Sequence, residues 1–336
     1  MGIQGVWFVL LWAVALGNWG CFDPDSVLLL TYSKVDARAL GFSNGQAHLK
    51  AKGGAPPYIY VWFKGGGSGS SRINLLPGQY TVVVSDAIGV ADSVSFEIGI
   101  LNAGATIEWE QIPSGTFSMG SPNNEVERDG NEGLQHGVSI SGFKMSKYEA
   151  PFAQCDVFCD ATGRQKPDDE GWGRVNRPAI NVNWNEAMAF ALWVGPGCRL
   201  PTEAEWEYAC RAGTTTPFYS GSCLSNNQAN YYGNYPYFSC PIGNYLGQTM
   251  PVGSYNPKAW GLCDMHGNGM EWCSDWYGPY SGGSQTNPSG PTAGSNRVLR
   301  GGSWFGYGRY CRSAYRGSGI PSCRSDFIGF RLVVPN

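Results

Sequence analysis

The apolar residues in the first third of the chain fall in short runs rather than long stretches. The runs at 58–63 and 80–85 are rich in aromatic and β-branched residues, and clusters of Gly, Pro and Ser bound them. This pattern is typical of β-strands separated by turns. Residues 22–101 are therefore expected to form a small all-β sandwich, and nothing in that segment points to catalysis.

Residues 106–336 show a different pattern, after a linker expected at 102–105. Apolar residues follow a helical spacing at 152–162 and 184–193, which predicts two amphipathic helices. Thr202 and Glu205 form a capping box that marks the start of a third helix. Its acidic residues are expected to be structural, because the helix dipole stabilises carboxylates in a first turn. Beyond Gly213 the chain is rich in Gly, Asn, Tyr and Pro, which predicts a domain dominated by loops.

Three motifs in this second part stand in a recognisable order. They are Arg-Leu-Pro-Thr-Glu-Ala-Glu-Trp-Glu-Tyr at 199–208, Gly-Asn-Gly-Met-Glu-Trp at 267–272, and Arg-Gly-Gly-Ser-Trp at 300–304 with Ile-Gly-Phe-Arg-Leu at 328–332. Together they resemble the formylglycine-generating-enzyme, or sulfatase-modifying-factor, family. The resemblance implies an α+β, C-type-lectin-like domain at 106–336. The first module resembles the immunoglobulin-like sandwich repeats of bacterial surface proteins.

The chain departs from this family where the enzymes hold their copper. The resemblance implies two cysteines after Gly-Gly-Ser-Trp, whose soft thiolates suit copper(I). This chain has Gly306 and Cys311 at those places. One sulfur does not make a two-sulfur site, so the chain is expected not to be an enzyme. The alternatives are a formylglycine-generating oxidase and a catalytically silent paralogue.

The segment at about 300–332 mixes two classes of residue. Residues of the first class resemble family constants, and they include Arg309, Arg312, Arg316 and Arg324, which are suited to holding loops. Those of the second class all belong to the set that codons of the form NNC encode. They are Phe305, Gly306, Tyr307, Tyr310, Gly317, Ser318, Gly319, Ile320, Ser322, Cys323, Ser325, Asp326 and Phe327.

This mixture resembles the variable region of proteins diversified by retroelements. The resemblance implies that the second class binds a macromolecular ligand, most simply a protein, with aromatic residues set among small ones as in antibody loops. The alternative is an ordinary solvated loop. Nucleic acid is not an expected partner, because the formal charge is -3 and no basic run is present.

One metal site is expected, and no catalytic cofactor. Asp264 and Glu271 flank glycines whose carbonyls can turn inward, and hard oxygen ligands suit calcium. The family resemblance implies calcium ligands at Asp264 and Glu271 by side chain and at Gly267 and Gly269 by carbonyl. The alternative is a hydrogen-bonded turn without metal.

The N-terminal residues predict export. An apolar run at 6–16 with no charge before Asp23 indicates a signal peptide at 1–21. Cys21 follows Gly20, which suggests a lipoprotein whose anchor attaches it to a membrane. Eleven cysteines without zinc-ligand spacing fit an oxidising compartment, as disulfides or buried thiols. The expected location is the cell surface or outer membrane.

Overall fold

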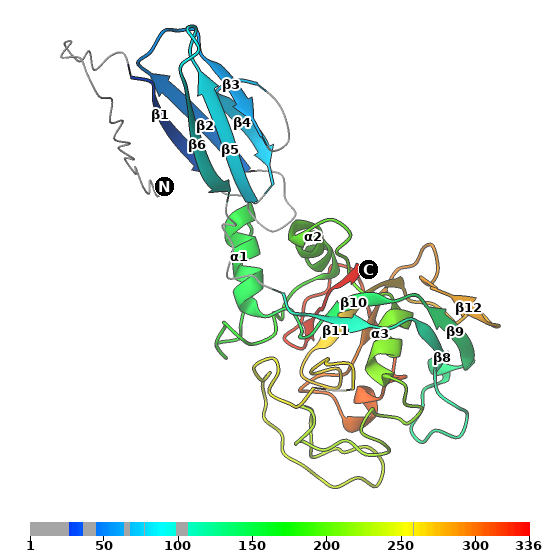
Figure 1. The fold of residues 1–336 in the computed structure, drawn as a ribbon. Coiled ribbons are helices and arrows are strands. Elements are labelled where there is room, and N and C mark those ends of the chain that lie inside the picture. The colour runs from blue at the N-terminus through cyan, green and yellow to red at the C-terminus, as the bar shows by residue number, and fades with distance from the viewer. Residues whose placement is uncertain (1–26, 36–44, 64–67, 77, 99–106, 258) are drawn as a thin grey trace. The chain divides into compact units, whose positions relative to one another are not determined.

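The computed structural model describes residues 27–35, 45–63, 68–76, 78–98, 107–257 and 259–336 (Figure 1). The signal peptide, Cys21 and the linker at 102–105 lie outside these residues. The chain divides into two compact units, one with the early strands and one with the elements from residue 109 onward. In the described part of the chain no helix has the length and apolar character needed to cross a membrane.

The first unit is all-β. Its strands are β1 (Leu29–Val35), β2 (Gly45–Lys52), β3 (Ile59–Trp62), β4 (Ser71–Leu75), β5 (Gly78–Ser85) and β6 (Ala91–Ile98). They form two three-stranded sheets, β1-β2-β4 and β3-β5-β6. Alternate residues of β5, among them Val82 and Val84, are fully buried, as expected for a strand with one face on a core. The strands predicted at 58–63 and 80–85 are thus confirmed.

The second unit combines three helices with short strands. The helices are α1 (Phe152–Thr162), α2 (Trp184–Val194) and α3 (Glu203–Arg211), and two 3-10 turns lie at Gly130–Glu132 and Gly308–Cys311. The strands are β7 (Trp109–Ile112), β8 (Gly115–Met119), β9 (His136–Ile140), β10 (Phe143–Ser146), β11 (Met270–Trp276), β12 (Gln285–Thr286), β13 (Arg297–Arg300), β14 (Gly317–Gly319), β15 (Ile328–Gly329) and β16 (Val333–Pro335).

The helices begin and end where the sequence predicts. The Thr202 hydroxyl accepts from the main-chain N–H of Glu205 at 3.1 Å, and the Glu205 carboxylate accepts from that of Thr202 at 2.8 Å, so the capping box is confirmed. Helix α1 is capped at its C-terminal end by Gly163, whose φ of 69° is a backbone conformation that favours glycine. Helices α1 and α2 pack through Phe158 and Phe190, whose ring centroids are 5.5 Å apart.

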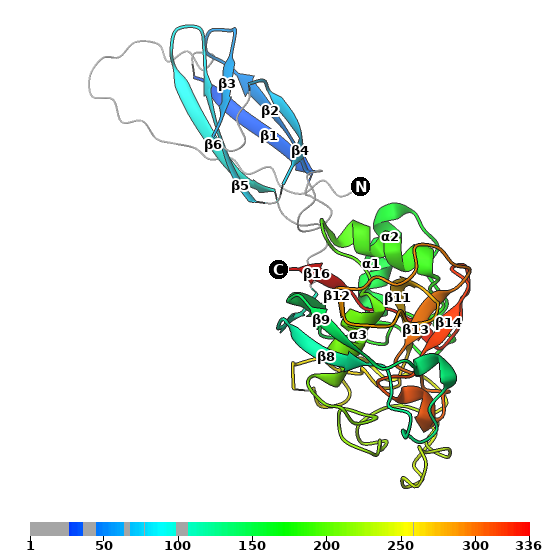
Figure 2. The same ribbon diagram turned by 90° about the vertical axis from the view of Figure 1, so that its right-hand side faces the viewer.

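The sheet that carries the C-terminal segment has the order β14-β13-β11-β15. β11 pairs antiparallel with β13 and parallel with β15, so that β14 and β15 are the edge strands. Figure 2 labels β11, β13 and β14. The central strand buries Trp272 completely, and its indole N–H donates to the Val182 carbonyl at 2.9 Å. The strands on either side of β11 therefore lie on a fixed support.

Four buried arginines tie this segment to the rest of the unit. We call Arg300, Arg312, Arg316 and Arg331, with their carboxylate partners, the arginine frame. The pairs are Arg300 with Glu207, Arg312 with Glu125 and Glu132, Arg316 with Glu203, and Arg331 with Glu271. The predicted role of Arg312 and Arg316 is confirmed. The acidic residues of α3 do more than complement the helix dipole, because Glu203 and Glu207 are the counter-charges of this frame.

Arg312 connects the C-terminal segment, through buried ion pairs, to the loop that carries Glu125 and Glu132. Its guanidinium donates to both Glu132 oxygens, at 2.6 and 2.7 Å, and both side chains are fully buried. Burial opposes the ionisation of Glu132, but the hydrogen bonds and charge of Arg312 outweigh it and hold the Glu132 pKa below its usual value. The pair is therefore ionised across the neutral range.

We expect Arg312→Leu to lower the free energy of unfolding of this unit by about 3–5 kcal/mol, because two buried carboxylates lose their counter-charge. The matched control is Arg324→Leu in the same segment. Arg324 pairs with Glu186 at the surface, where a salt bridge contributes about 1 kcal/mol or less. Urea denaturation of both variants measures the difference, and equal losses would contradict the assignment.

Candidate binding face

The two classes of residue in the C-terminal segment differ in burial. All thirteen residues of the second class are exposed or half-buried. Most of the first class is buried, including Trp304, Gly308, the runs 311–314 and 328–332, and Arg316. Arg309, Tyr315 and Pro321 are half-buried, and Arg324 is exposed. All the positions expected to vary are therefore accessible, and most of the others are enclosed.

Trp304 and Gly302 help to fix the path of the segment. The Trp304 indole N–H donates to the Asp326 carbonyl at 3.0 Å, which joins the two ends of the segment. Gly302 has φ 74°, and a Cβ there would lie 2.6 Å from the Cys311 sulfur. Glycine is required at this position on both counts.

Five of the thirteen residues line one hollow of about 340 Å³, which we call the aromatic pocket. These are Phe305, Gly306, Tyr307, Tyr310 and Phe327. Tyr307 and Tyr310 stack with ring centroids 5.8 Å apart. None of the side chains that line this pocket carries a charge at neutral pH, so it suits an apolar or aromatic group.

The other eight residues lie on β14 and on the loop that follows it. This loop is held against the N-terminal end of α2, where Arg324 pairs with Glu186 and donates to the Asn181 carbonyl at 3.0 Å. These eight residues are accessible, but they do not line the aromatic pocket. They also do not line a second hollow, which shares Tyr307 with that pocket. The structure thus divides the predicted set into a pocket group and a strand-and-loop group.

The three glycines of the set differ in what a side chain would meet. A Cβ at Gly306 would have ordinary contacts with Ser303, at 3.4 Å or more. At Gly317 it would lie 2.6 Å from the Met270 methyl, the far end of a flexible side chain that can move. At Gly319 it would lie 3.0 Å from the Trp272 ring, which is buried and rigid. Gly319 is therefore the least tolerant of the three.

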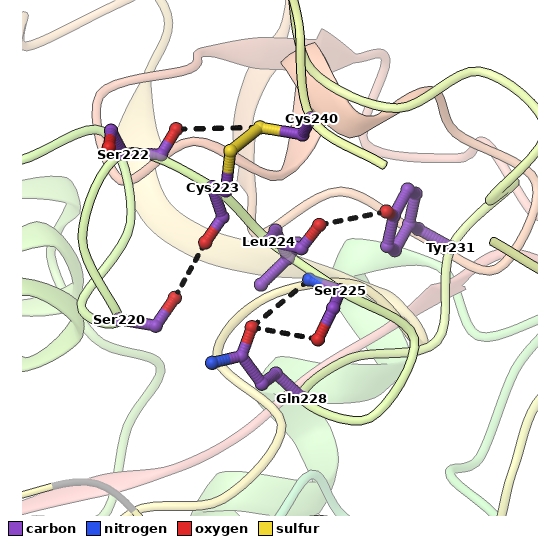
Figure 3. Close-up of a disulfide and its surroundings, with 8 residues drawn as sticks. All are labelled: Ser220, Ser222, Cys223, Leu224, Ser225, Gln228, Tyr231 and Cys240. Atoms are coloured by element: carbon purple, nitrogen blue, oxygen red, sulfur yellow. Dashed lines mark hydrogen bonds between the residues drawn. A yellow bond between two sulfur atoms is a disulfide. The ribbon is translucent and has the colours of Figure 1, made fainter. Parts of the chain in front are cut away.

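A second loop contributes aromatic residues that the sequence analysis did not single out. Tyr232 lines the aromatic pocket, and Tyr235 stacks on Tyr307 with centroids 4.4 Å apart. A disulfide between Cys223 and Cys240 closes this loop (Figure 3). The available signal was the aromatic-rich stretch 231–238 between two cysteines, but the pairing does not follow from sequence.

The closed loop is also fixed from within. The Tyr231 hydroxyl donates to the Leu224 carbonyl at 2.9 Å, and the Ser225 N–H donates to Gln228 Oε1 at 3.0 Å (Figure 3). Tyr231 is fully buried, whereas the neighbouring Tyr235 is about half exposed. The loop therefore presents its tyrosines on a rigid support.

Cys311 lies against Gly302, which lines the aromatic pocket, and is fully buried. It is a free thiol, so the disulfide alternative does not occur for this residue. Burial raises the pKa of Cys311 to about 12, and backbone groups of Ser303 and Gly267 offset this only in part. The thiol is protonated at neutral pH, whereas nucleophilic attack and metal binding need the thiolate.

The two carboxylates predicted to bind calcium contact other groups of the protein. Arg331 donates to both oxygens of Glu271, at 2.6 and 2.7 Å, and Gly253 N–H donates to Asp264 Oδ2 at 2.6 Å. Across the described residues, no three His, Cys, Asp or Glu side chains converge on one point at metal-ligand distance. Calcium binding by Asp264, Gly267, Gly269 and Glu271 stays a prediction.

Glu149 is a third carboxylate whose charge interacts with those of Asp264 and Glu271. Burial raises the pKa of Glu149 well above its usual value, and the charges of Asp264 and Glu271 raise it further. The charge of Arg331 lowers the pKa of Glu149, but it offsets this rise only in part. Oxygen donors with an excess of negative charge are the environment that calcium prefers.

We expect calcium to raise the unfolding midpoint of the purified protein relative to the same protein in a chelator. A ligand that binds only the native state adds about 2.7 kcal/mol at a hundredfold excess over its Kd. The matched control is Asp264→Ala, which removes one predicted ligand and should abolish the calcium response. Identical midpoints with calcium and with chelator would contradict the predicted calcium site.

Comparison with known proteins shows the family to which the second unit is similar. Residues 105–335 match the family model for the sulfatase-modifying factor enzyme 1-like domain. The chain is 30% identical over 277 residues to the formylglycine-generating enzyme of Mus musculus, covering 66% of this chain and 73% of that protein. Among solved structures, PvdO from Pseudomonas aeruginosa aligns with a TM-score of 0.60 at 30% identity, over 69% of this chain and 98% of that one.

A further structure in this group is Treponema denticola variable protein 1. It aligns with a TM-score of 0.56 at 26% identity, over 72% of this chain and 96% of that one. The α+β, C-type-lectin-like class expected from the sequence is confirmed. The comparisons include both an enzyme and a variable protein, so they do not decide between catalysis and ligand binding.

Proposed function

Since the chain belongs to the family that carries the sulfatase-modifying factor enzyme 1-like domain, we propose that it uses this domain to bind a macromolecular ligand rather than to oxidise a cysteine. The proposed contact surface is the set of thirteen accessible residues in the C-terminal segment, diversified by a retroelement. The proposal includes export, display at the cell surface or outer membrane, and the alternative of a lipid anchor at Cys21.

The observation that carries the proposal is the separation by burial. Every residue expected to vary is accessible, whereas Trp304, Arg312 and Arg316 are buried in their contacts. Substitution at a surface position away from special contacts changes stability by about 0.5 kcal/mol or less. A surface of this kind can change its side chains while the backbone keeps its path.

The nature of the accessible residues supports binding as well. Phe305 and Tyr307 are large rings with about half of their surface exposed, next to small residues such as Gly306 and Ser303. Rigid aromatic side chains give contact area at a low cost in conformational entropy, and small residues allow adaptation. Similarity to a protein that is itself called a variable protein is consistent with this assignment.

The test is the variation of the gene within one lineage. We expect substitutions at the thirteen positions, with Gly319 the least varied, while Trp304, Arg312 and Gly329 stay constant. The physical reason is that loss of a buried contact costs several kcal/mol. A downstream near-copy of the segment and a reverse-transcriptase gene are expected beside it. Variation spread evenly over both classes, or an invariant segment without a repeat, would contradict the proposal.

The second candidate function is oxidation of a substrate cysteine to formylglycine. It is favoured by the 30% identity to a formylglycine-generating enzyme. Against it, Gly306 supplies no sulfur and Cys311 is a buried, protonated thiol. A copper(I) site made of two thiolates therefore lacks one of its ligands in this chain.

We expect no aldehyde when the purified protein is incubated with copper, oxygen and a Cys-x-Pro-x-Arg peptide. The matched variant is Gly306→Cys, which the contacts of Gly306 allow. Mass spectrometry of the peptide reads the outcome. Aldehyde formation by the unaltered protein would establish the oxidase instead, and formation only by the variant would show that the missing sulfur is what separates this chain from the enzymes.

A further inference from the structure

A second hollow, of about 450 Å³, adjoins the aromatic pocket and shares Tyr307 with it. Its other walls come from the disulfide-closed loop and from the residues that follow, including Tyr235, Phe238 and Ile242. Glu127 also lines this hollow, so we call it the Glu127 hollow. Apart from Tyr307 and Arg309, its lining lies outside the C-terminal segment.

Large apolar side chains that line the hollow are exposed to solvent. Phe238 is 64% exposed and Ile242 is 77% exposed, and the rings of Tyr235 and Tyr307 stack beside them. Apolar surface left in water is unfavourable by about 25 cal/mol per Å² relative to burial. A contiguous exposed patch of this kind marks an interaction site.

The two charged side chains that line the hollow are not equivalent. Arg309 is balanced, because its guanidinium pairs with Asp129 at 2.7 Å and lies over the Tyr310 ring. Glu127 is exposed, and its carboxylate has no hydrogen bond or ion pair to any other residue that the structure describes. The hollow therefore carries one uncompensated negative charge next to aromatic faces.

The position of Glu127 is fixed although its carboxylate is free. Its main-chain carbonyl accepts from the buried Arg312 guanidinium at 3.0 Å, so the arginine frame holds the backbone at this point. The facing wall is fixed as well, because the disulfide at Cys240 closes the loop that carries Phe238. Carboxylate and rings are thus presented by rigid elements.

We propose that the Glu127 hollow binds a cationic side chain, lysine or arginine, of the protein ligand. The proposal rests on the proposed function, because this hollow extends the binding face and names the chemistry of its ligand. A cation is attracted to an aromatic face within about 6 Å of the ring centroid. A carboxylate at the rim adds charge complementarity and disfavours acidic groups. The aromatic pocket, which lacks charge, takes a neighbouring apolar group of the same ligand.

The experiment compares two small probes on the full-length protein by ligand-detected NMR titration. The probes are N-acetyl-lysine methylamide and N-acetyl-norleucine methylamide, which share an unbranched side chain and differ in charge. We expect the lysine probe to bind more tightly than the norleucine probe and to weaken as salt is added. Equal affinity for the two probes, or no detectable binding of the lysine probe, would overturn the proposal.

Three variants locate the site. Glu127→Gln removes the charge and Phe238→Leu removes one ring, and each should raise the Kd of the lysine probe by about threefold. Glu97→Gln removes an exposed charge from β6 in the first unit and should leave the Kd unchanged. A loss with Glu97→Gln equal to that with Glu127→Gln would show only a general charge effect and would refute the site.

The outcomes separate this inference from the proposed function. If the lysine probe does not bind but the gene varies at the thirteen positions, the binding function stands and the cation site is wrong. If the probe binds through Glu127 but the segment is invariant, the site stands and the diversified surface is wrong.

Discussion

The buried pairs between arginines and carboxylates are the interaction on which the binding face depends. The segment 300–332 has little regular secondary structure, so hydrogen bonds of helices and sheets fix only part of its path. Arg300, Arg312, Arg316 and Arg331 supply the rest, each with a planar group of donors that reaches carboxylates and main-chain carbonyls together. Since loss of one partner leaves a buried charge, these residues cannot vary independently.

In this arrangement, the side chains that hold the backbone are buried, and the side chains proposed to contact a ligand lie on the surface. Trp304 and Arg312 are buried, whereas Phe305 and Tyr307, one and three positions after Trp304, are exposed. The same difference in burial bears on our proposal that this chain binds a ligand rather than oxidising a cysteine. Gly306 belongs to the accessible class, and Cys311 belongs to the buried class, where its thiol stays protonated.

Local signals allowed much of the fold to be predicted from the sequence. The helices at 152–162 and 184–193 and the capping box of α3 depend on neighbours close in the chain. The accessible positions after Trp304 follow from the family resemblance. The partners of the arginines follow from neither. Arg312 and Glu132 are 180 residues apart, so their pairing is a property of the tertiary structure. The contribution of Tyr235 and Phe238 to the face likewise depends on the Cys223–Cys240 disulfide, whose pairing no spacing rule determines.

The most direct test of the central claim is the stability of a protein whose surface is changed at several positions at once. The variant Phe305→Ser, Tyr307→Ser, Ile320→Ser alters three exposed members of the set, and Trp304→Ser alters one buried neighbour. The measurement is the free energy of unfolding of the second unit in urea. The account predicts a loss within about 1.5 kcal/mol for the triple variant and about 3–5 kcal/mol for Trp304→Ser. A loss in the triple variant as large as that in Trp304→Ser would contradict the claim that buried contacts, and not the accessible side chains, hold the face.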